Sequence, residues 1–134
     1  MSRYTRLRNS VLKSVKGVQA DAVAVTATSD GTGTGVIPAG TSFVTVTSAS
    51  ADYIVTLPAP VVGNIIYLYE TTNGFELRSS TPASIAINGG SGAGAESAVT
   101  AATLVKCVCT TSTTWVCNTF GSTGTEAALE AAAA

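Results

Sequence analysis

Short apolar runs separated by turn signals restrict this 134-residue chain to β-structure. The clearest case is residues 51–79, where β-branched and aromatic runs are interrupted by Pro58, Pro60, Gly63 and the pair Asn73–Gly74. Runs of this length are typical of strands and too short for helices, and proline cannot donate to a sheet ladder. The predicted strands of this stretch are residues 53–57, 65–69 and 75–78.

The order of signals in this stretch favours an antiparallel meander. Residues 65–69 are apolar on both alternating faces, which indicates a central strand covered on both sides by sheet, arm or a neighbouring subunit. Asn73–Gly74 accepts positive φ, as tight hairpin turns require. After it, Phe75 and Leu77 alternate with polar residues and are predicted to point inward.

The same reasoning predicts strands along the rest of the chain. They cover residues 22–28, 41–47, 85–87 and 99–108, and a final hairpin joins residues 103–110 to residues 114–118. The hairpin brings Cys107 near Cys117, and Trp115 is predicted to be a core or interface anchor. The predicted fold is all-β: a single β-sandwich or jelly-roll domain, or a barrel-like one. Strand spacing alone leaves sandwich and barrel open, and we favour the sandwich or jelly roll.

One domain fits the length of the chain, with a segment at each end. We predict a basic N-terminal arm at residues 1–20, a β domain at residues 21–121 and a C-terminal tail at residues 122–134. The Ala-rich tail has helix propensity but is too short to form a helix alone, so it would order only by packing on something.

Positive charge is concentrated at the N-terminus. The first sixteen residues carry five cations and no acid, and the remainder carries two cations and eight acids, so a +5 segment precedes a −6 body. Such a segment can bind nucleic acid, lie on a membrane, dock on an acidic protein or be a solvated terminus. Its charges are too dispersed for a polybasic run, and only Tyr4 can stack on a base, so protein docking is the favoured binding role. The candidate partner-binding residues are Arg3, Arg6, Leu7, Arg8, Val11, Leu12, Lys13 and Lys16.

The residues offer no recognisable catalytic motif. There is no histidine, and three cysteines at 107, 109 and 117 are too few and wrongly spaced for a structural zinc site. Their odd number argues against a disulfide framework, so they are interpreted as small buried apolar side chains. Glycines 31, 33 and 35 resemble a phosphate loop only loosely, because no Lys-Ser/Thr pair follows them. We therefore predict no enzyme activity, no cofactor and no metal.

Composition and the remaining segments indicate association with a protein partner. Charged residues are 11% of the chain, less than half of the roughly 25% typical of globular proteins, so its weakly charged surface suits burial. No signal peptide or membrane span is recognisable, which predicts a soluble chain made in the cytoplasm. The glycine-rich loops at residues 29–35 and 88–95 are additional candidate interaction sites.

The succession of turns and apolar positions resembles small β modules of tailed-bacteriophage structural proteins. The likeness rests on residues 36–40, 55–58 followed by Gly63, 73–74, 87–89 and 104–105 ahead of the hairpin at Trp115–Val116, and it spans roughly residues 36–120. Similar modules occur in capsid decoration (cement) proteins, head fibres and tail fibres.

The resemblance implies a structural virion protein that binds the outer capsid surface as an oligomer, commonly a homotrimer, and stabilises the head. Its implied partners are the major capsid protein and neighbouring copies of itself, without nucleic acid or membrane. Its implied location is the virion surface, after synthesis in the host cytoplasm. The alternative is a fibre or tail-associated knob that binds a receptor or glycan. The short chain, with no internal repeat, favours decoration over a fibre.

Overall fold

The computed structural model describes residues 22–134, so the predicted basic arm lies outside the described residues. The described chain is all-β, as the sequence predicts, and a single short 3-10 turn, η1 (Gly33–Gly35), is its helical element. The strands are β1 (Ala22–Thr26), β2 (Phe43–Thr47), β3 (Ile54–Thr56), β4 (Ile65–Glu70), β5 (Phe75–Arg78), β6 (Ala86–Ile87), β7 (Ser97–Val99), β8 (Thr103–Thr111), β9 (Thr114–Phe120) and β10 (Glu126–Ala128).

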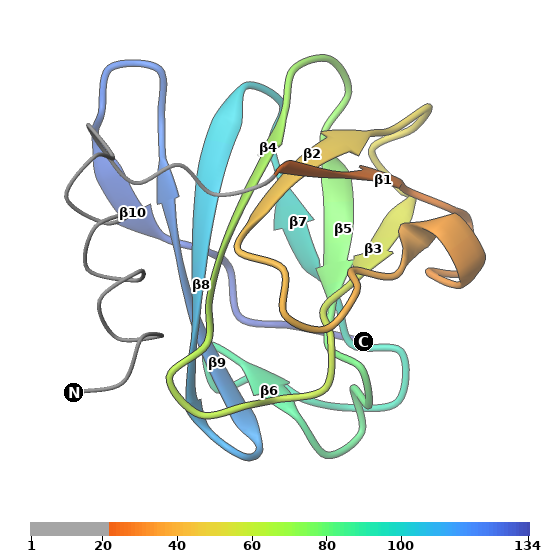
Figure 1. The fold of residues 1–134 in the computed structure, drawn as a ribbon, viewed down its shortest axis with the longest axis vertical. Coiled ribbons are helices and arrows are strands. Elements are labelled where there is room, and N and C mark those ends of the chain that lie inside the picture. Colours follow the sequence, from red (N-terminus) through yellow and green to blue (C-terminus); the bar gives the residue numbers. More distant parts are fainter. Residues whose placement is uncertain (1–21) are drawn as a thin grey trace, which may run out of the picture.

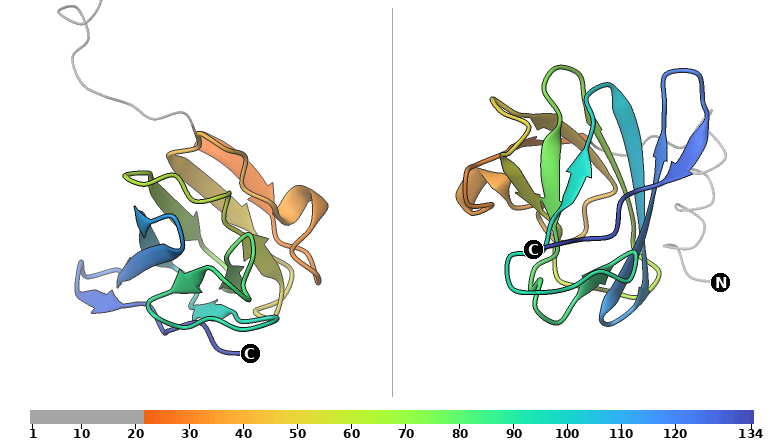
Figure 2. Two further views of the ribbon diagram at one scale, coloured as in Figure 1. Left: turned by 90° about the horizontal axis from the view of Figure 1, so that it is seen from below. Right: turned by 180° about the vertical axis from the view of Figure 1, so that it is seen from behind.

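These strands form two curled sheets that face each other across one core (Figures 1 and 2). The large sheet has the order β1-β2-β4-β8-β9-β10, with β6 paired to β9, and the small sheet has the order β3-β5-β7. Both sheets are mixed: β1-β2, β2-β4, β3-β5 and β6-β9 are parallel, whereas the other pairs are antiparallel. The result is a half-barrel, within the sandwich or barrel-like class expected.

The predicted meander is wrong, because β4 belongs to the large sheet and β3 and β5 pair in parallel in the small one. The segment at Asn73–Gly74 therefore crosses between sheets and forms no hairpin. Glu70 holds this crossing: its buried Oε2 accepts hydrogen bonds from the backbone N–H groups of Thr72, Asn73 and Gly74 at 2.8, 3.0 and 2.9 Å. A hairpin would lose this acceptor, which sits on the core side of β4.

Strand β4 is central, as predicted, but the described residues cover only one of its faces. Ile66 and Leu68 are fully buried beneath the small sheet. On the opposite face Ile65 and Tyr69 are 41% and 36% exposed. The cover expected on both faces is therefore present on one face only within residues 22–134.

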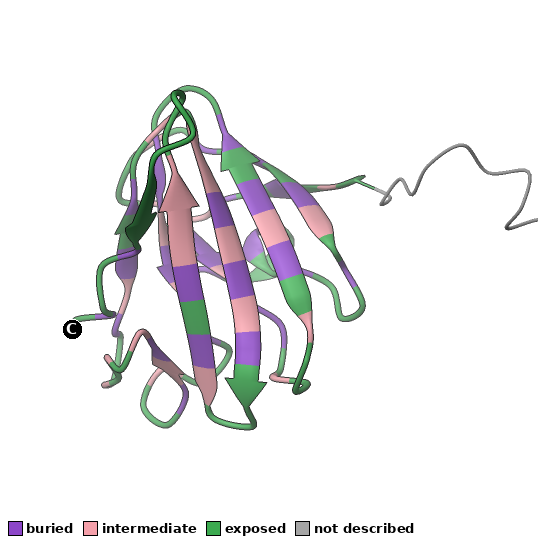
Figure 3. Ribbon diagram, turned by 90° about the vertical axis from the view of Figure 1, so that its left-hand side faces the viewer, coloured by how far each residue is buried: buried purple, intermediate pink, exposed green. Residues whose placement is uncertain are grey.

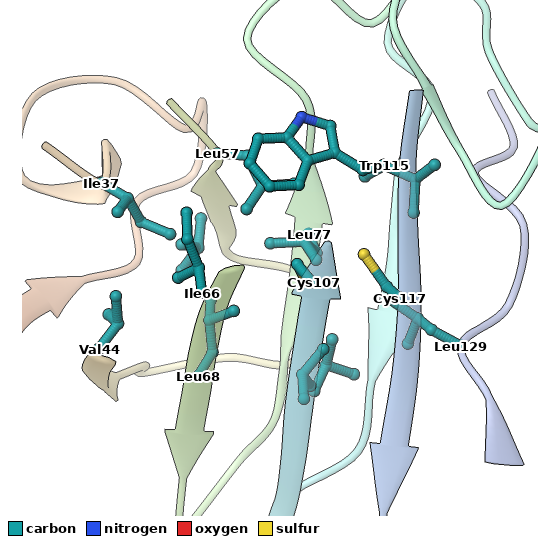
Figure 4. Packing of buried hydrophobic residues seen from close by; sticks show 14 of the residues in the cluster. Ile37, Val44, Leu57, Ile66, Leu68, Leu77, Cys107, Trp115, Cys117 and Leu129 are labelled. Atoms are coloured by element: carbon teal, nitrogen blue, oxygen red, sulfur yellow. The ribbon is translucent and has the colours of Figure 1, made fainter. Parts of the chain in front are cut away.

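The core lies between the sheets, and Figure 4 shows its members pointing inward from both. Trp115 is its largest fully buried side chain, which confirms the predicted anchor. Cys107 and Cys117 lie opposite each other on β8 and β9, as the simplest hairpin register requires. All three cysteines are buried and free, which confirms their interpretation as core residues.

The Ala-rich tail is ordered by packing on the domain, as predicted, and it forms a strand and an extended segment instead of a helix. Strand β10 pairs with β9, Leu129 is buried, and the last residues run back across the end of the fold toward β6 and β7 (Figure 2, right). There Ala132 N–H donates to the Ile87 carbonyl at 3.2 Å, and Ala133 forms an antiparallel bridge with Glu96. The edge of β9 and the segment around β6 and β7 supply backbone hydrogen-bond partners to the tail. A helix this short would have to satisfy its backbone groups by itself, which is unfavourable.

Candidate functional site

The predicted partner-binding residues all lie outside residues 22–134, so the structure does not place them. They are Arg3, Arg6, Leu7, Arg8, Val11, Leu12, Lys13 and Lys16. The described body instead offers two candidate surfaces, one apolar and one polar, on opposite sheets.

The first surface is the side of the large sheet that faces away from the core, called the outer face below. Strand pairing arranges its side chains in rows, because directly opposed residues point to the same side. One row is Phe43, Tyr67, Lys106 and Asn118; the next is Thr45, Tyr69, Leu104 and Phe120; the third is Ile65, Val108 and Val116. Lys106 is the one charged side chain in these rows.

Large apolar side chains on the outer face remain accessible. Val116 is 43% exposed, close to the values for Ile65 and Tyr69, and Val61 and Val62 in the loop before β4 are more than half exposed. Gly63 N–H donates to the Cys109 carbonyl at 2.9 Å, which keeps this loop beside β8. Figure 3 shows the long strands side by side, with buried bands alternating with intermediate and exposed ones. Accessible apolar side chains gathered on one sheet face in this way make the outer face a candidate interaction site.

The corresponding side of the small sheet is different. Its outward residues include Thr56, Glu76 and Arg78, and the segment after β1 packs over it. A Cβ on Gly31 would lie 2.7 Å from Ile54 Cγ2, so this segment approaches the sheet too closely for any larger residue. The outward side of the small sheet is therefore polar and covered by the segment after β1. The outer face of the large sheet is mainly apolar, and no described residues cover it.

The second surface is a groove beside that covering segment, called the loop groove below. It has a volume of about 420 Å³, and both glycine-rich loops contribute to it: Asp30 and Thr32 from the first and Gly94 from the second. Arg78, the last residue of β5, and Ser80, two residues beyond it, complete the polar wall of the groove. The loops singled out in the sequence thus meet at one place.

Arg78 connects the two loops across the groove. One guanidinium nitrogen donates to the Asp30 carbonyl at 3.0 Å, and another forms an ion pair with Glu96. Its buried Nε has no hydrogen-bond partner among the described residues. Sequence alternation placed Arg78 correctly on the outward side of its strand, but nothing local indicated the two loops that it joins.

The first loop is held by Asp30. Its Oδ1 accepts hydrogen bonds from the hydroxyls of Thr32 and Thr28 and from the Thr32 N–H, at 2.8, 3.1 and 3.1 Å. The Thr32 hydroxyl, then the Thr32 N–H and the Thr28 hydroxyl, lower the pKa of Asp30 below its usual value. The carboxylate therefore presents a negative charge at the rim of the loop groove at neutral pH.

The second loop is tied to the domain by Asn88. Its side chain donates to the carbonyls of Cys117 and Leu129 at 2.8 and 2.6 Å and accepts from the Cys117 N–H at 2.8 Å. Asn88 adopts positive φ, which asparagine tolerates better than most residues. This one side chain links β6, β9 and the C-terminal segment.

The ionisable groups show no catalytic arrangement within the described residues. Burial raises the pKa of the Cys107 and Cys109 thiols, so neither is prepared to act as a thiolate nucleophile at neutral pH. In residues 22–134 no three His, Cys, Asp or Glu side chains are grouped to hold a metal ion. The same residues contain no helix with the length and hydropathy of a membrane span.

Comparison with known proteins gives no further assignment. No protein-family model, curated protein or solved structure matches this chain.

Proposed function

We propose that this chain is a structural protein of a tailed-bacteriophage particle that binds the outer surface of the capsid as a decoration protein. The support is of two kinds: the pattern of turns and apolar positions resembles such modules, and the described body presents an uncovered apolar sheet face, with no catalytic arrangement among the described residues. In this proposal the protein stabilises the head and is located on the virion surface after synthesis in the host cytoplasm.

The observation that carries the proposal is the outer face of the large sheet. A soluble domain with 11% charged residues and an uncovered apolar sheet face needs a protein surface or a segment of chain against it. The proposed partners are the major capsid protein and neighbouring copies of the chain, as a homotrimer, with no role for nucleic acid or membrane.

The basic arm supplies orientation in this proposal. Charges at an interface steer association and fix orientation more than they add affinity. The apolar arm residues must also find an apolar surface to pack on, because ordering a segment costs about 1–2 kcal/mol of backbone entropy per residue and charge alone does not offset it.

Copy number on purified particles tests the proposal directly. Hundreds of copies per particle indicate a capsid location, whereas a few copies indicate the tail, and absence from particles refutes a virion role. Deletion of residues 1–16 should leave the body folded while abolishing retention on particles. Replacement of Arg3, Arg6 and Arg8 by Ala should weaken retention and reduce its dependence on salt. Full retention of the truncated chain would show that the arm makes no contribution.

The loop groove favours a second candidate function, a knob that binds a receptor glycan. It combines a carboxylate, a guanidinium and several hydroxyls beside apolar Leu57 and Pro58, which is chemistry suited to a sugar ring. Glycan-array binding that Ser80→Trp abolishes, and that Ser112→Trp in the exposed β8-β9 turn leaves intact, would support this function. Binding by neither parent nor variants would exclude it for the sugars tested.

A further inference from the structure

The outer face is about the size that one short helix or extended segment would cover. Its five strand spacings from β1 to β10 span about 24 Å, and the distance along β4 from Ile65 to Tyr69 is about 14 Å. The product is roughly 340 Å², less than half of the about 800 Å² that each partner contributes to a standard protein interface. A second copy resting on this face alone would therefore fall short of a stable contact.

The residues that precede Ala22 are joined to the domain at one edge of this same sheet. Ala22 is the first residue of β1, and within residues 22–134 β1 pairs with β2 alone. Five residues, 17–21, would give residues 2–16 a tether of up to about 17 Å. As a helix those fifteen residues would be about 23 Å long, which equals the width of the face.

The arm sequence carries the matching pattern. In a helix, Leu7, Val11 and Val15 would share one side, because they recur every four residues. Arg6 and Lys13 would point to the opposite side. One side of the arm is therefore mainly apolar, with Arg8 beside Val15 at its margin, and the other suits solvent or an acidic partner.

The charges agree with a crossing from β1 toward β10. An arm that starts at β1 and crosses toward β10 would bring its first basic residues, Arg3 and Arg6, to the far edge of the sheet. Glu126 lies there, exposed and directly opposite Phe120, so it points to the outer side. Residues 22–134 carry seven acids against two cations, so they attract the basic arm as a whole.

We propose that residues 2–16 pack across the outer face of their own chain, with Leu7, Val11 and Val15 against the sheet. The short tether favours the chain's own face over that of another copy, since linkage of this length gives an effective concentration on the order of millimolar. Packed in this way, the arm covers the exposed side of β4 and presents a basic surface outward. The proposal does not rest on a virion role, since it concerns the isolated chain.

Hydrogen exchange on the purified full chain tests the proposal. Backbone amides of residues 2–16 should exchange at least about tenfold more slowly than in an unstructured peptide. Val116→Lys, in the third row of the outer face, should remove this protection. Val36→Lys is the matched control, because Val36 is 42% exposed against 43% for Val116 but lies beside the loop groove.

Exchange of the arm at the unstructured rate in the parent chain would overturn the proposal, as would equal effects of the two lysine variants. If the arm is unprotected and Val116→Lys lowers the mass found by light scattering, a second copy is the occupant. The double variant Leu7→Cys with Val116→Cys distinguishes own chain from neighbour under mild oxidation. A disulfide within one chain supports the proposal, and one that joins two chains overturns the assignment to the chain's own face.

Discussion

Removal of the Glu70 carboxylate should destabilise the domain more than any other single change at a polar residue in the β4-β5 segment. In Glu70→Ala three backbone N–H groups lose their acceptor, and the N–H of Gly74 is buried. A buried donor without a partner costs about 1–3 kcal/mol, and the two more exposed bonds contribute about 0.5–1.5 kcal/mol each. The expected loss of unfolding free energy is about 2–6 kcal/mol, a large part of the roughly 5–15 kcal/mol that stabilises a typical domain.

Urea unfolding followed by the fluorescence of Trp115 measures this loss, since the single tryptophan is fully buried. The midpoint should fall with the slope unchanged, because the same surface is exposed on unfolding. Glu70→Gln keeps an acceptor oxygen and should lose clearly less. Glu130→Ala, at an exposed position of the C-terminal segment, should stay within about 0.5 kcal/mol of the parent. A loss below about 1 kcal/mol for Glu70→Ala would refute the argument that this carboxylate holds the crossing between the sheets.

Three further predictions address the C-terminal segment, pH and assembly. Gly90→Ala should destabilise the fold by about 1–3 kcal/mol in the same urea assay, because the added Cβ would lie 2.0 Å from the Ala132 carbonyl oxygen. Gly121→Ala is the control: a Cβ at that position meets nothing within 4 Å, so this change should be neutral. Burial, followed by the nearby Glu96 carboxylate, raises the pKa of Glu76 above its usual value. Stability from the protonated form is therefore present at acid pH and is lost as pH rises through that raised pKa. Glu76→Gln should therefore increase the free energy of unfolding at pH 7 but not at pH 3. The increase should be no more than about 0.5 kcal/mol, because the site is largely solvated. An equal gain at both pH values would contradict this cause. Light scattering of the full chain should give the mass of a trimer, and the mass of a single chain at micromolar concentration would exclude it.

Local pattern in the sequence was enough to predict most of the strands and much of the core. It did not separate β7 from β8, which the prediction joined as one strand at residues 99–108, and it did not predict β10. The alternation of β-branched and polar residues follows the two-residue period of a strand, so it identifies Val44, Val46 and Leu77 as inward residues without knowledge of their neighbours. The same reasoning predicted that Trp115 and the cysteines are buried. It also indicated, through the apolar character of both faces of β4, that Ile65 and Tyr69 need a partner. The sequence identified the two glycine-rich loops as candidate interaction sites. It did not indicate that Arg78 would lie between them and hold both.

Strand pairing was decided by tertiary structure, because it depends on contacts between residues far apart in the chain. Asn73–Gly74 correctly signalled positive φ, which Gly74 adopts at 78°, but the dipeptide does not encode whether the next strand returns to the same sheet. The buried acceptor of Glu70 and the close approach of Gly74 to the Val99 carbonyl select the crossing. Likewise, helix propensity in the alanine-rich tail is a weak local preference. The free edge of β9 and the side chain of Asn88 offer its backbone hydrogen bonds that an isolated helix of that length cannot match.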